Sequence, residues 1–224
     1  DNQKYSYAAS FGVADISDVK AMQLRPLLKN FQSFSVREKS ALNIVKKITG
    51  KNGVCHIDPT LLLNKDEWQK ISVKKIDKPY ILVFNVKPVK SLIDFAEKLS
   101  KKTGIPVVYI TDDPQKKRKN FTYVSAPTVE EFLGYFANAD YTVTNSFHGT
   151  AFSVIFHKNM FVEYETAKGF NHRAKNLLQT IGINREIKDG EAVTTDIDWN
   201  KVDNILQAER KLSLDYLKDI IKGE

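Results

Sequence analysis

The chain has 224 residues, and its 34 lysines and arginines against 27 aspartates and glutamates give a formal charge of +7. Apolar residues make up 42% and charged residues 27%, a globular composition that excludes a disordered chain. The single cysteine, Cys55, excludes an intrachain disulfide and favours a reducing compartment. Apolar runs such as residues 151–156 fall far short of the roughly 18 residues of a membrane span. The positive charge favours anionic partners without selecting one.

Short β-rich segments alternate with helical patterns over residues 1–63. Strands are predicted at Tyr5–Phe11, Phe34–Val36 and Val54–Ile57, and helices at Asp18–Phe31 and Ser40–Thr49. Pro26 must lie near an end or a break of the first helix, because proline has no backbone N–H. Gly50 ends the second helix. The charged segment Lys65–Lys78 has weak periodicity, and we interpret it as a linker or a domain boundary.

A second alternating series begins near residue 80. Its predicted strands are Tyr80–Val86, Pro106–Thr111, Phe121–Val124, Asp140–Thr144 and Asn159–Tyr164. Its predicted helices are Val89–Lys102, Val129–Ala137, Ser146–His157, Asn171–Ile181 and Trp199–Lys222. The continuous apolar run Tyr80–Val86 is typical of a strand buried on both faces of a sheet.

This alternation predicts an α/β fold with parallel sheets, because parallel neighbours need crossover connections. The strands are too numerous for one small sheet, so we expect two Rossmann-like α/β units, residues 1–66 and residues 67–224. We assign the last helix, Trp199–Lys222, to the second unit. Alternatively, this helix packs back on the first unit. A Rossmann-like unit needs more strands than residues 1–63 supply. We therefore expect the first unit to be truncated, the C-terminal part of a longer domain.

A truncated first unit has consequences for the surface of the chain. Its strands would have too few neighbours, so we expect Tyr5, Tyr7, Phe11 and Phe34 to be exposed. Exposed apolar patches and unpaired strand edges promote association. A homo-oligomer formed through this unit is the expected result.

The sharpest candidate site is the junction where the strand ending at Thr144 gives way to a helix. Its polar residues are the candidate substrate-binding positions Asn145, Ser146, Gly149 and Thr150, together with His148. Ligands of open α/β sheets bind at the carboxyl ends of the strands, and the first turn of a helix binds phosphate or carboxylate through N–H groups. Gly149 would allow close approach of an anion, and His148 can act as a general acid or base near neutral pH. Alternatively, Asn145 or Ser146 caps the helix and His148 is a packing residue.

Arg37 follows the strand Phe34–Val36 and precedes a helix, so it also lies at a strand's carboxyl end. A guanidinium there can bind a carboxylate or phosphate through two parallel hydrogen bonds. The alternative is a surface ion pair with Glu38. The nearby segment Asp58–Thr60 is interpreted as a turn, because Asp-Pro commonly initiates turns.

Other charged clusters favour structural roles. Asp112 and Asp113 have no further carboxylate at ligand spacing, and the four histidines show no zinc-type pairing, so we expect no metal site. The run Lys116–Lys119 has no accompanying aromatic nucleic-acid motif, so we expect no nucleic-acid partner. The sequence contains no Gly-x-Gly-x-x-Gly, P-loop or Gly-x-Ser-x-Gly pattern, which argues against NAD enzymes, NTPases and serine hydrolases.

Several segments, taken together, resemble the polysaccharide pyruvyl transferase family. They are Tyr7–Gly12, Phe34–Glu38, Asp58–Leu62 and Thr144–Ser153, in the order found in that family. Arg173 with residues 176–178 and 182–183 resembles the family's next segment. The Asn-Ser-Phe-His-Gly-Thr block and the upstream Ser-Val-Arg-Glu are the specific part. The similarity covers nearly the whole chain, although members usually have a segment before the first strand that this chain lacks.

The resemblance implies a two-domain fold like that of the GT-B glycosyltransferases, with the site between the domains. It implies transfer of pyruvate from phosphoenolpyruvate to two hydroxyls of a sugar in a cell-surface polysaccharide or its precursor, which gives a cyclic ketal and phosphate. The family histidine falls on His148, as general acid. The family arginine falls on Arg37, as a ligand of the donor, and Arg173 is a further substrate-binding residue. No cofactor or metal is expected.

Two alternatives stay open at this point. A nucleotide-sugar glycosyltransferase of GT-B type would share the fold, and donor binding separates it from a pyruvyl transferase. The other alternative is a non-catalytic fragment or binding module. The presence of both His148 and Arg37 argues against it. We expect a cytoplasmic location at the inner face of the membrane, with peripheral membrane association.

Overall fold

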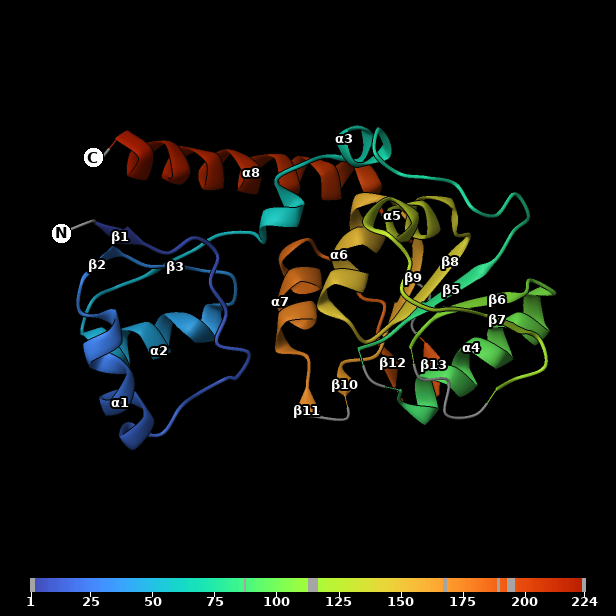
Figure 1. Cartoon of the computed structure of the whole chain (residues 1–224), viewed down its shortest axis with the longest axis horizontal. Coiled ribbons are helices and arrows are strands. Elements are labelled where there is room, and N and C mark those ends of the chain that lie inside the picture. The colour runs from blue at the N-terminus through green and yellow to red at the C-terminus, as the bar shows by residue number, and fades with distance from the viewer. Residues whose placement is uncertain are drawn as a thin grey trace. The chain divides into compact units, whose positions relative to one another are not determined.

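The computed structural model describes residues 3–86, 88–112, 117–166, 169–188, 190–192 and 196–222. It divides into two compact units, of which one contains residues 1–62 and 200–224 and the other residues 63–199. Parallel strands alternate with helices in each of them (Figure 1). The predicted α/β class with parallel sheets is therefore confirmed.

Three extended segments of the first unit lie side by side in parallel. The paired strands are β1 (Lys4–Tyr5) with β2 (Phe31–Ser33) and β3 (Ser35–Val36) with β4 (Val54–Cys55). A bridge from Ala9 to Val36 joins the two pairs, so the segment 31–36 is central. The continuous strand predicted over Tyr5–Phe11 is wrong, because Ala8 has a φ of 46° and interrupts the extended chain.

Helices α1 (Asp18–Leu28) and α2 (Lys39–Thr49) are the crossover connections of this unit. Pro26 lies in the last turn of α1, near the helix end as predicted. Phe34 is 4% exposed, because Ala41 and Val45 of α2 pack over it. The expectation that Phe34 is exposed is therefore wrong, while Tyr5, Tyr7 and Phe11 are half-buried.

Helix α8 (Trp199–Lys222) contacts the first unit through residues beyond Asn200. The Tyr216 hydroxyl donates to the Ser6 carbonyl oxygen at 2.9 Å and lies 2.7 Å from Ser33 Oγ. Arg210 Nε donates to the Leu61 carbonyl oxygen at 2.7 Å. These hydrogen bonds tie α8 to the end of β1, to β2 and to the 3₁₀ turn Pro59–Leu61.

The second unit contains a five-stranded parallel sheet with the order β7-β6-β5-β8-β9. Its strands are β5 (Ile81–Phe84), β6 (Val107–Ile110), β7 (Phe121–Val124), β8 (Tyr141–Thr144) and β9 (Asn159–Val162). Its longer helices are α4 (Lys90–Thr103), α5 (Val129–Asn138), α6 (Phe147–Ile155) and α7 (His172–Thr180). After β5 the chain adds strands on one side and then on the other, which is the Rossmann-like arrangement.

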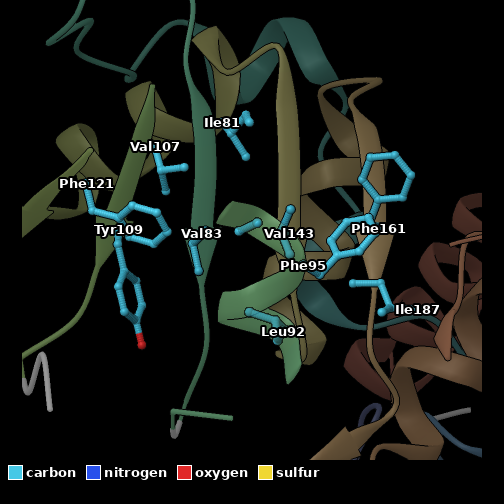
Figure 2. Packing of buried hydrophobic residues seen from close by; sticks show 11 residues of the cluster. Ile81, Val83, Leu92, Phe95, Val107, Tyr109, Phe121, Val143, Phe161 and Ile187 are labelled. Atoms are coloured by element: carbon cyan, nitrogen blue, oxygen red, sulfur yellow. The ribbon is translucent and has the colours of Figure 1, made fainter. Parts of the chain in front are cut away.

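Helices cover both faces of this sheet. Figure 2 shows Leu92 and Phe95 of α4 against Val83, Val143 and Phe161, which belong to one buried cluster. On the opposite face, aromatic rings of α5 and α6 pack against Phe84 and against each other in edge-on and tilted pairs, in the set Phe84, Phe132, Phe136 and Phe152. Burial on both faces explains why β5 and β6 are continuous apolar runs rather than alternating ones.

The segment predicted as a linker is partly structured. Lys65–Gln69 form the short helix α3, which a capping box between Asn64 and Glu67 stabilises. Further along, Val73 N donates to the Glu130 carbonyl oxygen at 2.9 Å, so this segment also packs on α5. The sequence did not predict this helix, because one turn without buried residues leaves no periodic apolar signal, and the division between the two units falls just before it, after Leu62.

Two small antiparallel hairpins were not predicted. They are β10 (Glu165–Thr166) with β11 (Gly169–Phe170), and β12 (Ile187–Lys188) with β13 (Glu191–Ala192). Each strand has two residues, too few to show the alternation that identifies a strand in a sequence. Ile187 nevertheless joins the cluster under α4 (Figure 2).

Candidate functional site

The polar block that follows Thr144 lies at the topological switch point of the second sheet. β5 and β8 are neighbours, and Phe84 and Thr144 are partners in their register. Asn85 and Asn145 therefore leave adjacent strands at the same edge. In open parallel sheets the ligand crevice lies outside the carboxyl ends of the strands at this point.

Asn145 is 3% exposed, and its Oδ1 makes no hydrogen bond within the residues that the structure describes. Asn85 is also buried, with Oδ1 accepting from the Tyr109 hydroxyl at 2.9 Å. Its Nδ2 is without a hydrogen bond in the same described part of the chain. Buried polar atoms are rarely left unsatisfied, so an acceptor and a donor at this edge are suited to a ligand or a water molecule.

Ser146 is the N-cap of α6. Its Oγ accepts from Gly149 N at 3.3 Å, while its own N–H donates to Thr144 Oγ1 at 3.0 Å. The Thr150 hydroxyl donates to the Ser146 carbonyl oxygen at 2.9 Å. The capping interpretation of Ser146 is thus confirmed, and both hydroxyls stabilise the start of the helix. Their predicted contacts with substrate stay predictions.

Gly149 allows α6 to pack closely on the sheet. A Cβ at this position would lie 2.2 Å from Thr144 Oγ1 and 3.2 Å from Phe84 Cδ1. The missing side chain therefore faces β5 and β8 and the interior. This close packing explains the glycine in the sequence block without a ligand.

A second helix begins beside the first. Asn171, the N-cap of α7, donates from Nδ2 to the Asn145 carbonyl oxygen at 2.8 Å and accepts at Oδ1 from Ala174 N at 3.2 Å. Asn145 directly precedes the N-cap of α6. A single hydrogen bond therefore joins the residue before the N-cap of α6 to the N-cap of α7, so the two helix N-termini lie next to each other. Because each helix carries about half a positive charge at its N-terminus, two converging N-termini favour an anion.

Arg173 and His148 both lie close to the aromatic ring of Phe147. The Arg173 guanidinium carbon is 5.7 Å from the centroid of the Phe147 ring, a cation–π distance. The His148 ring centroid is 5.3 Å from the same ring, and its side chain is exposed. The structure therefore brings together three predicted site residues, Asn145, His148 and Arg173.

Arg37 lies at the carboxyl end of β3 in the first unit and forms an ion pair with Asp58. Asp58 also accepts from Thr60 N at 3.0 Å and from Thr60 Oγ1 at 2.7 Å, which caps the 3₁₀ turn Pro59–Leu61. Glu38 is buried and accepts instead from the Ser10 hydroxyl at 2.8 Å. The alternative of a pair between Arg37 and Glu38 is therefore wrong, because Asp58 supplies the carboxylate.

The other charged clusters have structural partners. Arg118, within the basic run, pairs with Glu97 and with Asp94 at 2.6 Å. Asp112 Oδ1 accepts from the Ser125 hydroxyl at 3.0 Å and joins the ends of β6 and β7. Asp113 and Lys116 lie outside the described residues. Within those residues, no group of three His, Cys, Asp or Glu side chains could hold a metal ion.

Sequence reasoning did not single out His56, which supports the end of β4. Its Nδ1 lies 2.8 Å from Ser35 Oγ, and that oxygen already accepts from Ala8 N at 2.9 Å. Ser35 Oγ and His56 Nδ1 are therefore hydrogen-bonded, and the tautomer of the imidazole sets which of the two donates. Tyr216 lies against the ring at a centroid distance of 4.7 Å. Burial lowers the pKa of His56 below its ordinary value.

This environment predicts a pH-dependent stability. The unfolded chain binds a proton at His56 below about pH 6.5, whereas the folded chain binds it only at lower pH. The contribution of neutral His56 is therefore present above that pH and is lost as the pH falls towards the lowered pKa. Between about pH 7.5 and about pH 5.5, denaturant unfolding should show a smaller loss of stability for His56→Asn than for the wild type, because asparagine does not titrate and can still hydrogen-bond to Ser35. Equal losses for both proteins would contradict this role.

The fold and site thus define an α/β protein in which two helix N-termini meet at the switch point of the parallel sheet. A family model described as polysaccharide pyruvyl transferase matches residues 1–164. The chain belongs to the polysaccharide pyruvyl transferase family, as the sequence predicted.

Solved structures give weaker similarities. The UDP-GlcNAc 2-epimerase of Methanocaldococcus jannaschii, in complex with UDP-GlcNAc and UDP, has a TM-score of 0.49 and 10% identity over 80% of this chain. MurG of Acinetobacter baumannii has a TM-score of 0.44 and 10% identity, with 92% of this chain and 77% of that chain covered. This chain spans 61% of the epimerase chain. A search of curated protein sequences finds no match.

Proposed function

We propose that this chain is a pyruvyl transferase that moves pyruvate from phosphoenolpyruvate to two hydroxyls of a sugar in a cell-surface polysaccharide or its precursor. Family membership supports the transferase class. The observation that carries the choice of donor is the meeting of two helix N-termini, where Asn171 Nδ2 is 2.8 Å from the Asn145 carbonyl oxygen.

Phosphoenolpyruvate suits this junction because it is small and carries both a phosphate and a carboxylate. The N-termini of α6 and α7 offer partial positive charge and N–H groups. Arg173, over the Phe147 ring, adds a guanidinium that can bind an oxyanion with two hydrogen bonds. The orphan amide atoms Asn145 Oδ1 and Asn85 Nδ2 can accept from and donate to one hydroxyl, as a sugar acceptor would require.

In the proposed reaction, His148 donates a proton to the methylene carbon of the donor, which becomes a methyl group. Positive charge develops on the neighbouring carbon, and a sugar hydroxyl adds there and loses its proton. Phosphate then leaves with its bonding electron pair, and a second hydroxyl adds with loss of a second proton. The product is a cyclic ketal; one of the two released protons restores His148, and the other leaves with the phosphate. We propose that these reaction steps need no cofactor and no metal ion.

Calorimetry and a phosphate-release assay test the proposal. The full chain should bind phosphoenolpyruvate, and a sugar acceptor should make phosphate release faster than in its absence. UDP-GlcNAc is the control ligand for the glycosyltransferase alternative. Binding of UDP-GlcNAc with no binding of phosphoenolpyruvate would overturn the proposed function in favour of that alternative.

Arg37 supplies a separate prediction about the donor. Arg37→Lys should weaken phosphoenolpyruvate binding, because an ammonium cannot reproduce the planar fork of a guanidinium. Lys39→Gln, at an exposed neighbouring position, is the matched control for the change in local basicity. Titration calorimetry compares the two dissociation constants. An unchanged constant for Arg37→Lys would mean that Arg37 serves only its ion pair with Asp58.

Location and assembly belong to the same proposal. The single cysteine agrees with a reducing compartment, and we propose the cytoplasm. The charge of +7 would favour peripheral contact with anionic lipids at the inner face of the membrane. Self-association into a homo-oligomer is also proposed. In the described ranges, the structure has no helix that is long and apolar enough to span a membrane.

A further inference from the structure

We propose that Asn171 is a positioning residue of the transferase, because its amide sets α7, and with it Arg173, against the start of α6, which carries His148. This inference rests on the proposed function. Asn171 need not touch either substrate. Its effect on the reaction passes through the relative placement of the two helices.

Three hydrogen bonds hold Asn171 between separate segments. Its backbone N–H donates to the Tyr164 carbonyl oxygen at 2.6 Å, its Nδ2 donates to the Asn145 carbonyl oxygen at 2.8 Å, and its Oδ1 accepts from Ala174 N at 3.2 Å. The residue is 8% exposed, so water competes little for these bonds. One side chain thus joins the end of β8 to the first turn of α7.

The contacts explain why an amide occupies this position. Capping α7 needs only an acceptor, which serine or aspartate also provides. The bond to Asn145 needs a donor on the same short side chain. Aspartate would place a carboxylate oxygen against the Asn145 carbonyl oxygen, and serine is too short to span both partners. The hydrogen bond from Nδ2 to the Asn145 carbonyl oxygen, which bridges the two helix starts, therefore explains the asparagine better than the cap does.

The bridge matters because of what each helix carries. Arg173 is the second residue of α7, and His148 is the second residue of α6. Both lie beside Phe147, at 5.7 Å for the Arg173 guanidinium carbon and 5.3 Å for the His148 ring. A displacement of about 1 Å between reacting groups can lower a rate by about 10²-fold. Loss of the Nδ2 bond should therefore reduce turnover even when α7 stays folded.

Asn171→Asp tests this in the full chain, because it keeps the cap and removes the donor. We expect kcat for acceptor-dependent phosphate release to fall by about 10-fold or more at a temperature where the variant is folded, although loss of the buried hydrogen bond also lowers its thermal unfolding midpoint. Asn64→Asp is the matched control, since Asn64 caps α3 by accepting from Glu67 N at 3.0 Å. That variant should keep wild-type turnover. Asn171→Ala, which loses cap and bridge, should lose both turnover and stability.

A second readout keeps this inference separate from the proposed function. Amide NMR signals of His148 and Arg173 should shift in Asn171→Asp and stay in place in Asn64→Asp, whether or not the chain turns over phosphoenolpyruvate. A wild-type chain without acceptor-dependent phosphate release would refute the proposed function. Unmoved signals, or an Asn171→Asp variant with wild-type kcat, would refute the positioning role.

Discussion

Replacing His148 by alanine is expected to lower the rate of pyruvyl transfer by about 10²–10⁴-fold, the usual contribution of a general acid. His148 is exposed on the first turn of α6, and Ser146 caps that helix without it. The fold should therefore survive the substitution. Acceptor-dependent phosphate release measures the rate, and denaturant unfolding checks the fold.

His148→Gln makes this test sharper. Glutamine can still donate a hydrogen bond to bound phosphoenolpyruvate, but it cannot transfer a proton to its methylene carbon. Both variants should therefore lose turnover, while phosphoenolpyruvate binding by the glutamine variant should fall less than its rate. Near-wild-type turnover in His148→Ala would remove His148 from the mechanism and would leave its packing against Phe147 as its role.

The sequence predicted best those elements whose signal is local. The helix Trp199–Lys222 and the strand Phe121–Val124 have the predicted bounds. The helix has a sustained apolar stripe with no glycine or proline, and the strand lies between turn residues. The first strand was predicted incorrectly, because its extent depended on the φ of Ala8, and the short helix α3 was missed, because it depends on a cap at Asn64 and buries nothing.

In the candidate site, too, residues with a local sequence signal were predicted, and contacts between distant residues were not. A strand end followed by polar residues identified Asn145 and His148, because both signals lie within a few residues. The bond between Asn171 and Asn145 joins residues 26 positions apart, and the pair of Arg37 with Asp58 spans 21 positions. Such partners depend on which strands become neighbours in the sheet. The sequence could place Asn171 at a helix start. Its partner, Asn145, which directly follows β8, could be identified only from the three-dimensional structure.

Replacing Gly149 by alanine tests whether α6 needs its close approach to the sheet. Alanine is favoured over glycine in a helix by up to about 1 kcal/mol, so propensity alone predicts a more stable protein. The new Cβ would lie 2.2 Å from Thr144 Oγ1 and 3.0 Å from Thr144 Cβ, closer than packed atoms allow. Overpacking of this kind costs about 1–3 kcal/mol, so we expect a net loss in the free energy of unfolding. Denaturant unfolding measures it.

A double variant identifies the contact responsible. Thr144→Ala removes the Oγ1 atom that Gly149→Ala would strike, although it also removes the bond from Ser146 N to that oxygen. The two substitutions together should therefore be less destabilising than the sum of their separate effects. Rescue should be partial, because the new Cβ would still lie 3.0 Å from the Cβ of residue 144 and 3.2 Å from Phe84 Cδ1. Strictly additive losses would show that α6 tolerates the methyl group by shifting away from β8. In that case the start of α6, and His148 with it, would be less firmly fixed than these contacts indicate.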